Sequence, residues 1–262
     1  MKETINGLSV FLEGNNKNKP IIFIHGFPYD HTMWKAQIDL LSENYFCVTY
    51  DIRGLGESPA GDGQLTMESF VDDLASIIDN LKLDKPILCG LSMGGYIGLR
   101  ALERFEDKFS AVILCDTRSE ADNNEGKLKR SLAIKRINTE GLAPFTKDFI
   151  TNCYGNYYKN NFKEEFNNRI VKSLTFSPVG VKGSLLAMLS RNDTTDYLTK
   201  INIPALVICG EEDALTPPEV MKPLAEKIKE AVFVVIKNSG HMSPIENPIE
   251  VNEAIKKFLE RL

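Results

Sequence analysis

Short, nearly continuous apolar runs recur along the chain and alternate with amphipathic stretches. The runs are rich in β-branched residues and bounded by turn residues, which predicts strands covered on both faces. They fall at 21–24, 46–50, 86–89, 111–115, 205–209 and 232–236. Apolar residues at helical spacing follow near 32–42, 67–81, 93–104, 218–229 and 248–262. This alternation predicts an α/β fold with a mostly parallel, doubly wound sheet.

Two regions depart from the alternation. Near the start, Asn6-Gly7 separates two short runs and predicts a hairpin at an antiparallel edge of the sheet. Between 118 and 191 no convincing strand is found, and helical patterns fall near 127–137 and 170–190. We therefore expect this segment to be an inserted helical cap over the carboxyl end of the sheet, where such folds bind ligands.

The predicted domain organisation follows directly. Residues 1–117 and 192–262 form the α/β core domain, and residues 118–191 form the cap. Residues 118–190 are basic, with 12 Lys and Arg against 7 Asp and Glu, whereas the remainder of the chain has 19 against 29. A solvated surface explains this imbalance, and so does a cap that attracts an anionic or carrier-linked substrate.

Composition excludes several function classes. A net charge of −5 over 262 residues argues against non-specific nucleic-acid binding. No secretory signal or membrane-length apolar run is visible, so we expect a cytoplasmic protein without a membrane partner. The five cysteines form no C-x-x-C pair, and we predict that they are buried thiols. The three histidines lack metal-ligand spacing, so no metal is expected.

The strongest chemical signal is the pentapeptide from Gly90 to Gly94, Gly-Leu-Ser-Met-Gly, between a predicted strand and a predicted helix. A G-x-S-x-G turn in that setting is typical of a nucleophile elbow, which holds the serine in a strained conformation at a helix start. The flanking glycines leave room for this sharp turn. We therefore predict that Ser92 is a catalytic nucleophile, the alternative being a glycine-bearing turn that matches by chance.

A serine nucleophile needs a base, which a third group must orient. His241 lies in a turn-rich loop after the last predicted strand and is the preferred base, while His25 and His31 read as a loop residue and a surface residue. Asp213 follows the strand at 205–209 and is the preferred acid. The alternatives that stay open for the acid are Glu211, Glu212 and Asp116.

Acyl transfer also needs donors for the developing oxyanion. The backbone N–H of Met93 follows the nucleophile, and that of Phe27 lies in the loop after an early strand. These two groups are the predicted oxyanion hole. Cap aromatics can either line a pocket or pack together, and we interpret each as packing: Phe145, Phe149, Tyr154, Tyr157 and Tyr158.

Together these segments resemble the α/β-hydrolase superfamily. The matching motifs are His25-Gly26-Phe27-Pro28, Asp51-x-Arg53-Gly54-x-Gly56-x-Ser58, Gly90-x-Ser92-x-Gly94-Gly95, Gly210-x-x-Asp213 and Gly240-His241. The order serine, aspartate, histidine is that of the superfamily's triad. Within it the chain looks like the small capped esterases and lactonases, including carrier-protein methyl ester esterases, enol-lactonases and cofactor-free perhydrolases. Relatives that cleave epoxides or haloalkanes carry aspartate where Ser92 stands.

The resemblance implies a serine hydrolase that cleaves a carboxylic ester, thioester or lactone through an acyl-enzyme, without a cofactor. Perhydrolysis or C–C hydrolysis by the same residues is an alternative within catalysis. A non-catalytic ligand receptor on a hydrolase scaffold is the alternative of another class, since fold does not determine function. The acyl chain, the leaving group and the oligomeric state do not follow from the sequence.

Overall fold

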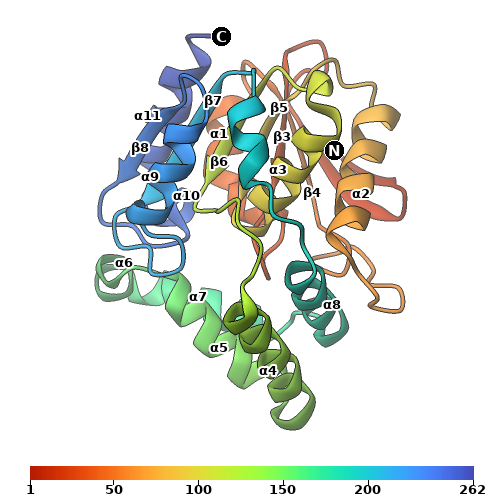
Figure 1. Cartoon of the computed structure of the whole chain (residues 1–262), viewed down its shortest axis with the longest axis vertical. Helices are drawn as coiled ribbons and strands as arrows, with labels where there is room; N and C mark the ends of the chain where they lie inside the picture. The colour runs from red at the N-terminus through yellow and green to blue at the C-terminus, as the bar shows by residue number, and fades with distance from the viewer.

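A single sheet of eight strands runs through the molecule (Figure 1). The computed structural model describes residues 1–262. The strand order is β1-β2-β4-β3-β5-β6-β7-β8, and all pairs from β4 to β8 are parallel. The strands are β1 (Lys2–Ile5), β2 (Leu8–Glu13), β3 (Pro20–Ile24), β4 (Phe46–Tyr50), β5 (Ile87–Leu91), β6 (Ala111–Cys115), β7 (Ala205–Gly210) and β8 (Val232–Ile236).

The predicted hairpin is confirmed, because β1 and β2 pair antiparallel around Asn6-Gly7 and β2 then pairs antiparallel with β4. One detail of the strand prediction is wrong. The pattern of β8 predicted a strand covered on both faces, yet β8 is the last strand of the sheet and four of its five residues are only partly buried. An edge strand has no neighbour on one side to exclude water from it.

Helices cover both faces of the sheet and create two apolar layers. Alternate strand residues point to opposite faces, so Ile22 and Ile24 pack with α2 and α3, while Ile21 and Phe23 pack with α1 and α11. The core helices are α1 (Lys35–Leu41), α2 (Met67–Asn80), α3 (Met93–Phe105), α9 (Pro218–Lys227), α10 (Ser243–Glu246) and α11 (Pro248–Leu259). The short 3-10 helices are η1 (His31–Trp34), η2 (Glu106–Lys108) and η3 (Thr195–Lys200). None of the helices combines the length and the apolar character that a bilayer crossing needs.

Five α-helices between β6 and β7 lie beyond one end of the sheet (Figure 1). They are α4 (Asn124–Glu140), α5 (Leu142–Cys153), α6 (Asn156–Asn161), α7 (Lys163–Ser173) and α8 (Pro178–Leu189), and we call them the cap. The helical character expected for this segment is present, but the pattern at 170–190 belongs to two helices. Ser177 caps α8 and Pro178 occupies its first turn, so the chain cannot continue from α7 as one helix.

The two chain segments that connect the cap to the core are bonded to each other. Thr194 N–H donates to the Ser119 carbonyl at 2.9 Å, and the side chains of Ser119 and Thr195 are also 2.9 Å apart. The guanidinium of Arg191 donates to Asp122 at 2.8 Å and to the Glu120 carbonyl at 2.7 Å. The entry and exit of the cap are therefore held side by side. The division into two domains at these segments stays a prediction.

Candidate active site

Ser92 occupies the sharp turn between β5 and α3. Its backbone has φ 53° and ψ −112°, a conformation that a residue with a side chain rarely adopts. The turn is held in place because Ser92 N–H donates to the Cys115 carbonyl at 2.9 Å, and Thr117 Oγ1 donates to the Ser92 carbonyl at 2.8 Å. The elbow predicted from the pentapeptide is thus present as a strained turn that β6 supports.

The two glycines of the pentapeptide leave space that the turn requires. A Cβ at Gly90 would lie 2.5 Å from the carbonyl oxygen of Gly94, and a Cβ at Gly94 would collide with the carbonyl oxygen of Ile24. Both obstacles are backbone atoms, which cannot swing aside. Any side chain at either position would therefore displace the turn that presents Ser92.

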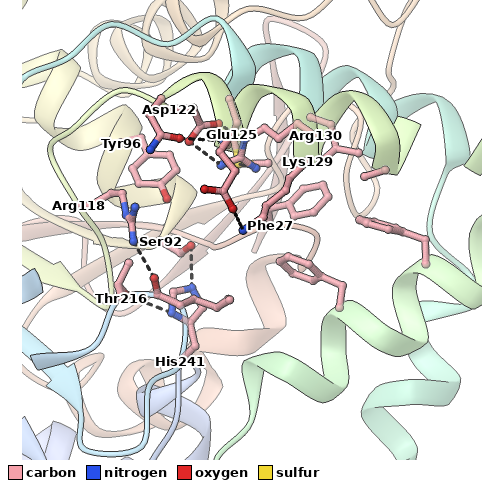
Figure 2. Close-up of a pocket in the computed structure, with 18 residues that line it drawn as sticks. Phe27, Ser92, Tyr96, Arg118, Asp122, Glu125, Lys129, Arg130, Thr216 and His241 are labelled. Atoms are coloured by element: carbon pink, nitrogen blue, oxygen red, sulfur yellow. Dashed lines mark hydrogen bonds and ion pairs between the residues drawn. The ribbon is translucent and has the colours of Figure 1, made fainter. Parts of the chain in front are cut away.

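The structure brings Ser92, His241 and Asp213 into one hydrogen-bonded line, which Figure 2 shows in part. His241 Nε2 is 2.8 Å from Ser92 Oγ, and His241 Nδ1 is 2.8 Å from Asp213 Oδ2. All three come from loops at the carboxyl ends of β5, β7 and β8. This geometry can pass a proton from the serine hydroxyl to the imidazole and can stabilise the cation that forms.

Hydrogen bonds from the loop that follows Asp213 orient its carboxylate toward His241. Leu215 N–H and Thr216 N–H donate to Oδ1 at 2.7 and 3.0 Å, and Thr216 Oγ1 donates to Oδ2 at 2.6 Å. Burial opposes ionisation of this group, but the neighbouring His241 and these hydrogen bonds lower the pKa of Asp213 to about 2. Asp213 is therefore an anion throughout the neutral range.

The other acidic candidates point elsewhere. Glu211 accepts from Asn238 N–H, and Glu212 accepts from Tyr157 N–H in the cap. Asp116 is fully buried, accepts from Gly210 N–H at 2.7 Å and is hydrogen-bonded to Ser243 Oγ. Burial and the charge of Asp213 raise the pKa of Asp116 well above its ordinary value, so ionisation of this carboxyl is disfavoured. None of these groups contacts His241 by a hydrogen bond.

The two remaining histidines have structural surroundings. The ring of His25 contacts its own loop at the Gly26 carbonyl and accepts from Ile52 N–H at 2.9 Å, and burial lowers its pKa. His31 was expected on the surface, but this is wrong. Its ring is stacked on Phe11 with centroids 3.5 Å apart and pairs with buried Asp51, leaving 19% of the side chain exposed.

The predicted oxyanion donors lie in the expected loops. Met93 is the first residue of α3, where backbone N–H groups have no partner within the helix. Phe27 follows β3 in a turn whose Phe27-Pro28 bond is cis. The backbone N–H groups of Phe27 and Met93 form no hydrogen bond with any carbonyl of the surrounding loops and turns. Both N–H groups are therefore free to bind a ligand atom.

A cavity of about 500 Å³ opens beside Ser92 and His241 under the cap. Its apolar lining comes from both core and cap, and includes Phe27, Phe145, Phe149, Leu185 and Met188. The interpretation of Phe145 and Phe149 as simple packing is therefore wrong, although both rings also contact Phe27. Tyr154 and Tyr158 do pack on each other, and Tyr157 is exposed.

The cap also contacts the loop that carries the histidine. His241 N–H donates to the carbonyl of Cys153, the last residue of α5, at 2.8 Å. Glu246 accepts from Met242 N–H at 3.0 Å and from Gly155 N–H at 2.8 Å, so it joins the histidine loop to the cap. Burial raises the pKa of Glu246 to about 7, against the effect of these backbone donors. Sequence reasoning missed this residue, because nothing local distinguishes it from a surface glutamate.

One group of side chains has the composition of a metal site. Ligand atoms of Asp116, Cys209 and Asp213 lie within 4.8 Å of one another. The two carboxylates already form hydrogen bonds within the protein. Asp213 is bonded to His241 and Thr216, and Asp116 accepts from Gly210 N–H. These hydrogen bonds position Asp213 beside His241, as an orienting acid requires. The expectation of a metal-free site stays a prediction.

Comparisons with known proteins agree with this architecture. A family model for the alpha/beta hydrolase fold matches residues 19–248. The structure of an esterase from Thermogutta terrifontis, solved with malate bound, is 35% identical with a TM-score of 0.92, covering 100% of this chain and 98% of that one. The enol-lactonase from Burkholderia xenovorans is 25% identical with a TM-score of 0.90, covering 99% and 100%. Among sequences, 3-oxoadipate enol-lactonase 1 of Acinetobacter baylyi is 26% identical over 97% of this chain and 94% of its own length.

Proposed function

The chain belongs to the α/β-hydrolase superfamily, in its esterase and lactonase group, and from that premise we propose that it is a serine hydrolase of carboxylic esters, thioesters or lactones. The observation that carries the proposal is the hydrogen-bonded line from Ser92 through His241 to Asp213, with 2.8 Å at each step. A nucleophile, a base and an orienting acid in contact are the minimum that acyl transfer by serine requires.

In the first half of the proposed reaction, Ser92 Oγ attacks the carbonyl carbon while His241 Nε2 takes the serine proton. The N–H groups of Phe27 and Met93 stabilise the oxyanion, an interaction for which one donor is typically worth about 3–4 kcal/mol. His241 then protonates the leaving alcohol, and an acyl group remains on Ser92.

In the second half, His241 takes a proton from water and the hydroxide attacks the acyl-enzyme. Ser92 leaves with the proton returned from His241, and the acid product is released. Asp213 keeps its charge throughout, because its role is to fix the imidazole tautomer and to stabilise the imidazolium. No cofactor is needed at any step of this scheme.

The surroundings of the site extend the proposal. A cavity lined by both polar and aromatic side chains is suited to a small organic ester. All five cysteines are buried and unpaired, which supports a reducing, cytoplasmic location. The excess of basic residues in the cap favours an anionic or carrier-linked substrate.

Pre-steady-state hydrolysis of p-nitrophenyl acetate tests the proposal. We expect a burst of p-nitrophenolate whose amplitude equals the enzyme concentration if deacylation is slower than acylation, and its loss in Ser92→Ala. Steady turnover that survives in Ser92→Ala would contradict the proposal, and so would its absence from the unaltered protein with every ester tried. Product analysis with added peroxide separates hydrolysis from perhydrolysis by the same residues, and a vinylogous diketone does so for C–C hydrolysis.

A further inference from the structure

The charged side chains around the cavity are unequally compensated. Lys129 pairs with Glu125 at 2.8 Å. Arg130 pairs with Asp122, which also receives Arg191 at 2.8 Å. The remaining cation, Arg118, forms no ion pair, although it lines the same cavity as Ser92 and His241. One positive charge of the lining is therefore left without a counter-ion in the protein.

Arg118 is also fixed in place. It lies two residues beyond Asp116 at the start of the segment that enters the cap, and its guanidinium donates to the Leu215 carbonyl at 2.7 Å. Leu215 belongs to the loop that binds Asp213, and the adjacent Thr117 donates to the Ser92 carbonyl. Through Leu215 and Thr117, Arg118 is therefore connected to the segments that hold Asp213 and Ser92. A guanidinium has five N–H donors, and only one of these donates a hydrogen bond to the protein.

The cavity offers both apolar and charged groups around Ser92. Figure 2 places Arg118 on one side of Ser92 and Phe27 on the other. Phe27 contacts the rings of Phe145 and Phe149, which line the cavity with it. A substrate that spans both sides would have its reactive carbonyl at Ser92, an apolar portion against the phenyl rings and an anion against the guanidinium.

Resting on the proposed function, we propose that Arg118 forms a carboxylate-binding subsite, so that the preferred substrates are esters or lactones carrying a free carboxylate. A planar guanidinium matches a carboxylate through two parallel hydrogen bonds, which a lysine cannot reproduce. The anchor to Leu215 means that little side-chain freedom is lost on binding. The subsite selects one half of the substrate and leaves the chemistry at Ser92 unchanged.

The test compares methyl hydrogen glutarate with its neutral counterpart, dimethyl glutarate, in the full-length protein and in Arg118→Gln. We expect kcat/KM for the anionic hemiester to fall about 10- to 100-fold, the range for losing a charge-assisted hydrogen-bonded pair. For the neutral diester we expect a change below about threefold. Equal losses for the two esters, or no loss for the hemiester, would overturn the proposal.

Three further variants separate the subsite from general charge effects. Lys147→Gln removes the same charge from an exposed position on α5 outside the cavity lining, and both esters should be hydrolysed as before. Lys129→Gln removes a lining cation that already has a partner, and a selective loss there in place of Arg118 would overturn the assignment. Arg118→Lys keeps the charge and should recover only part of the selectivity.

A binding measurement makes the result independent of turnover. Calorimetric titration of Ser92→Ala with glutarate should give a dissociation constant that rises about 10-fold or more when Arg118→Gln is added. If p-nitrophenyl acetate is hydrolysed through Ser92 but the affinity for glutarate is the same with and without Arg118→Gln, the assignment of the subsite is wrong and the proposed function stands. If glutarate binding depends on Arg118 but no ester is turned over, the proposed function fails while the anion site remains.

Discussion

The carboxyl edge of the sheet and the cap meet at one cavity, but they are built differently. At the edge, Ser92, Asp213 and His241 are held by buried hydrogen bonds from β6 and from the loop after β7. In the cap, α4 buries a single residue, Ile137, and most of its surface is charged and exposed. The edge thus holds the reacting groups by hydrogen bonds, whereas no hydrogen bond joins α4 to Ser92, Asp213 or His241.

This difference assigns separate tasks to the two regions. We infer that changes at the edge alter the rate with every substrate, and that changes in the cap alter which substrate is preferred. The regions touch where Cys153 accepts from His241 N–H and where Glu246 receives N–H groups from both. Only substitutions at this junction should change both the rate with every substrate and the preference among substrates.

The largest expected effect lies wholly at the edge. Ser92→Ala and His241→Ala should each lower kcat by about a millionfold, and the double variant should lose no more, because the groups act as one unit. Steady-state assays with an acetate ester and a hexanoate ester check both points. Additive losses in the double variant, or a loss for only one of the two esters, would break the separation of tasks.

The second effect distinguishes the two buried aspartates. Asp213→Asn should lower kcat by about ten-thousandfold, because an amide cannot hold the required tautomer or stabilise the imidazolium. Asp116→Asn should cost less than about tenfold, since Asp116 forms no hydrogen bond to His241 and an amide is its near-isostere. Measured kcat values at pH 7 decide this, and the reverse order would move the acid to Asp116.

The third effect belongs to the junction. Between the ordinary pKa of 4.5 and the folded value of about 7, the folded state keeps a proton on Glu246 that the unfolded state has released. The free energy of unfolding therefore falls as pH rises through this window and levels above it. A tenfold change in proton affinity is worth about 1.4 kcal/mol, so Glu246 should contribute a fall of roughly 2–3 kcal/mol between pH 5 and 8.

Urea unfolding of the wild type and Glu246→Gln at pH 5 and pH 8 isolates this contribution. The variant is expected to be less stable at pH 5, since one backbone N–H loses its acceptor, but to lose less stability towards pH 8. Other titrating groups, including Asp116, cancel in the difference between the two proteins. Parallel pH dependences would contradict the role given to Glu246.

The smallest expected effect is in the cap. Phe149 lines the cavity and its ring meets that of Phe27 at 5.2 Å. Phe149→Ala should lower kcat/KM for a hexanoate ester about tenfold through lost apolar contact, with less than about threefold change for an acetate ester. Tyr157→Ala, which removes an exposed cap ring outside the cavity, is the matched control. A uniform loss for both esters would mean that the cap also sets the rate.

The same contrast explains how much could be predicted from sequence. Strands of the core were predictable because each carries a dense apolar run, and Ser92, Asp213 and His241 follow such runs directly. In the cap, α5 and α6 were not predicted, and the break before Pro178 was missed. Helix α6 has only six residues, too few to show a helical period, and Pro144 interrupts the apolar spacing at the start of α5.

Site residues were missed for a related reason. Phe145 and Phe149 line the same cavity as Ser92, a placement that only the folded chain determines. The lack of an ion pair at Arg118 depends on which carboxylates Arg130 and Arg191 engage. Glu246 joins segments that are 91 residues apart in the chain. Contacts of this range leave no local pattern.

Intact-mass spectrometry after treatment with a fluorophosphonate tests the central claim most directly, because the reagent phosphonylates a serine only when a base in contact activates it. The account predicts one adduct per chain on the wild type, located at Ser92 by peptide mapping, and none on Ser92→Ala or on His241→Ala. An adduct that persists in Ser92→Ala, or a wild-type protein that remains unmodified under the same conditions, would contradict it.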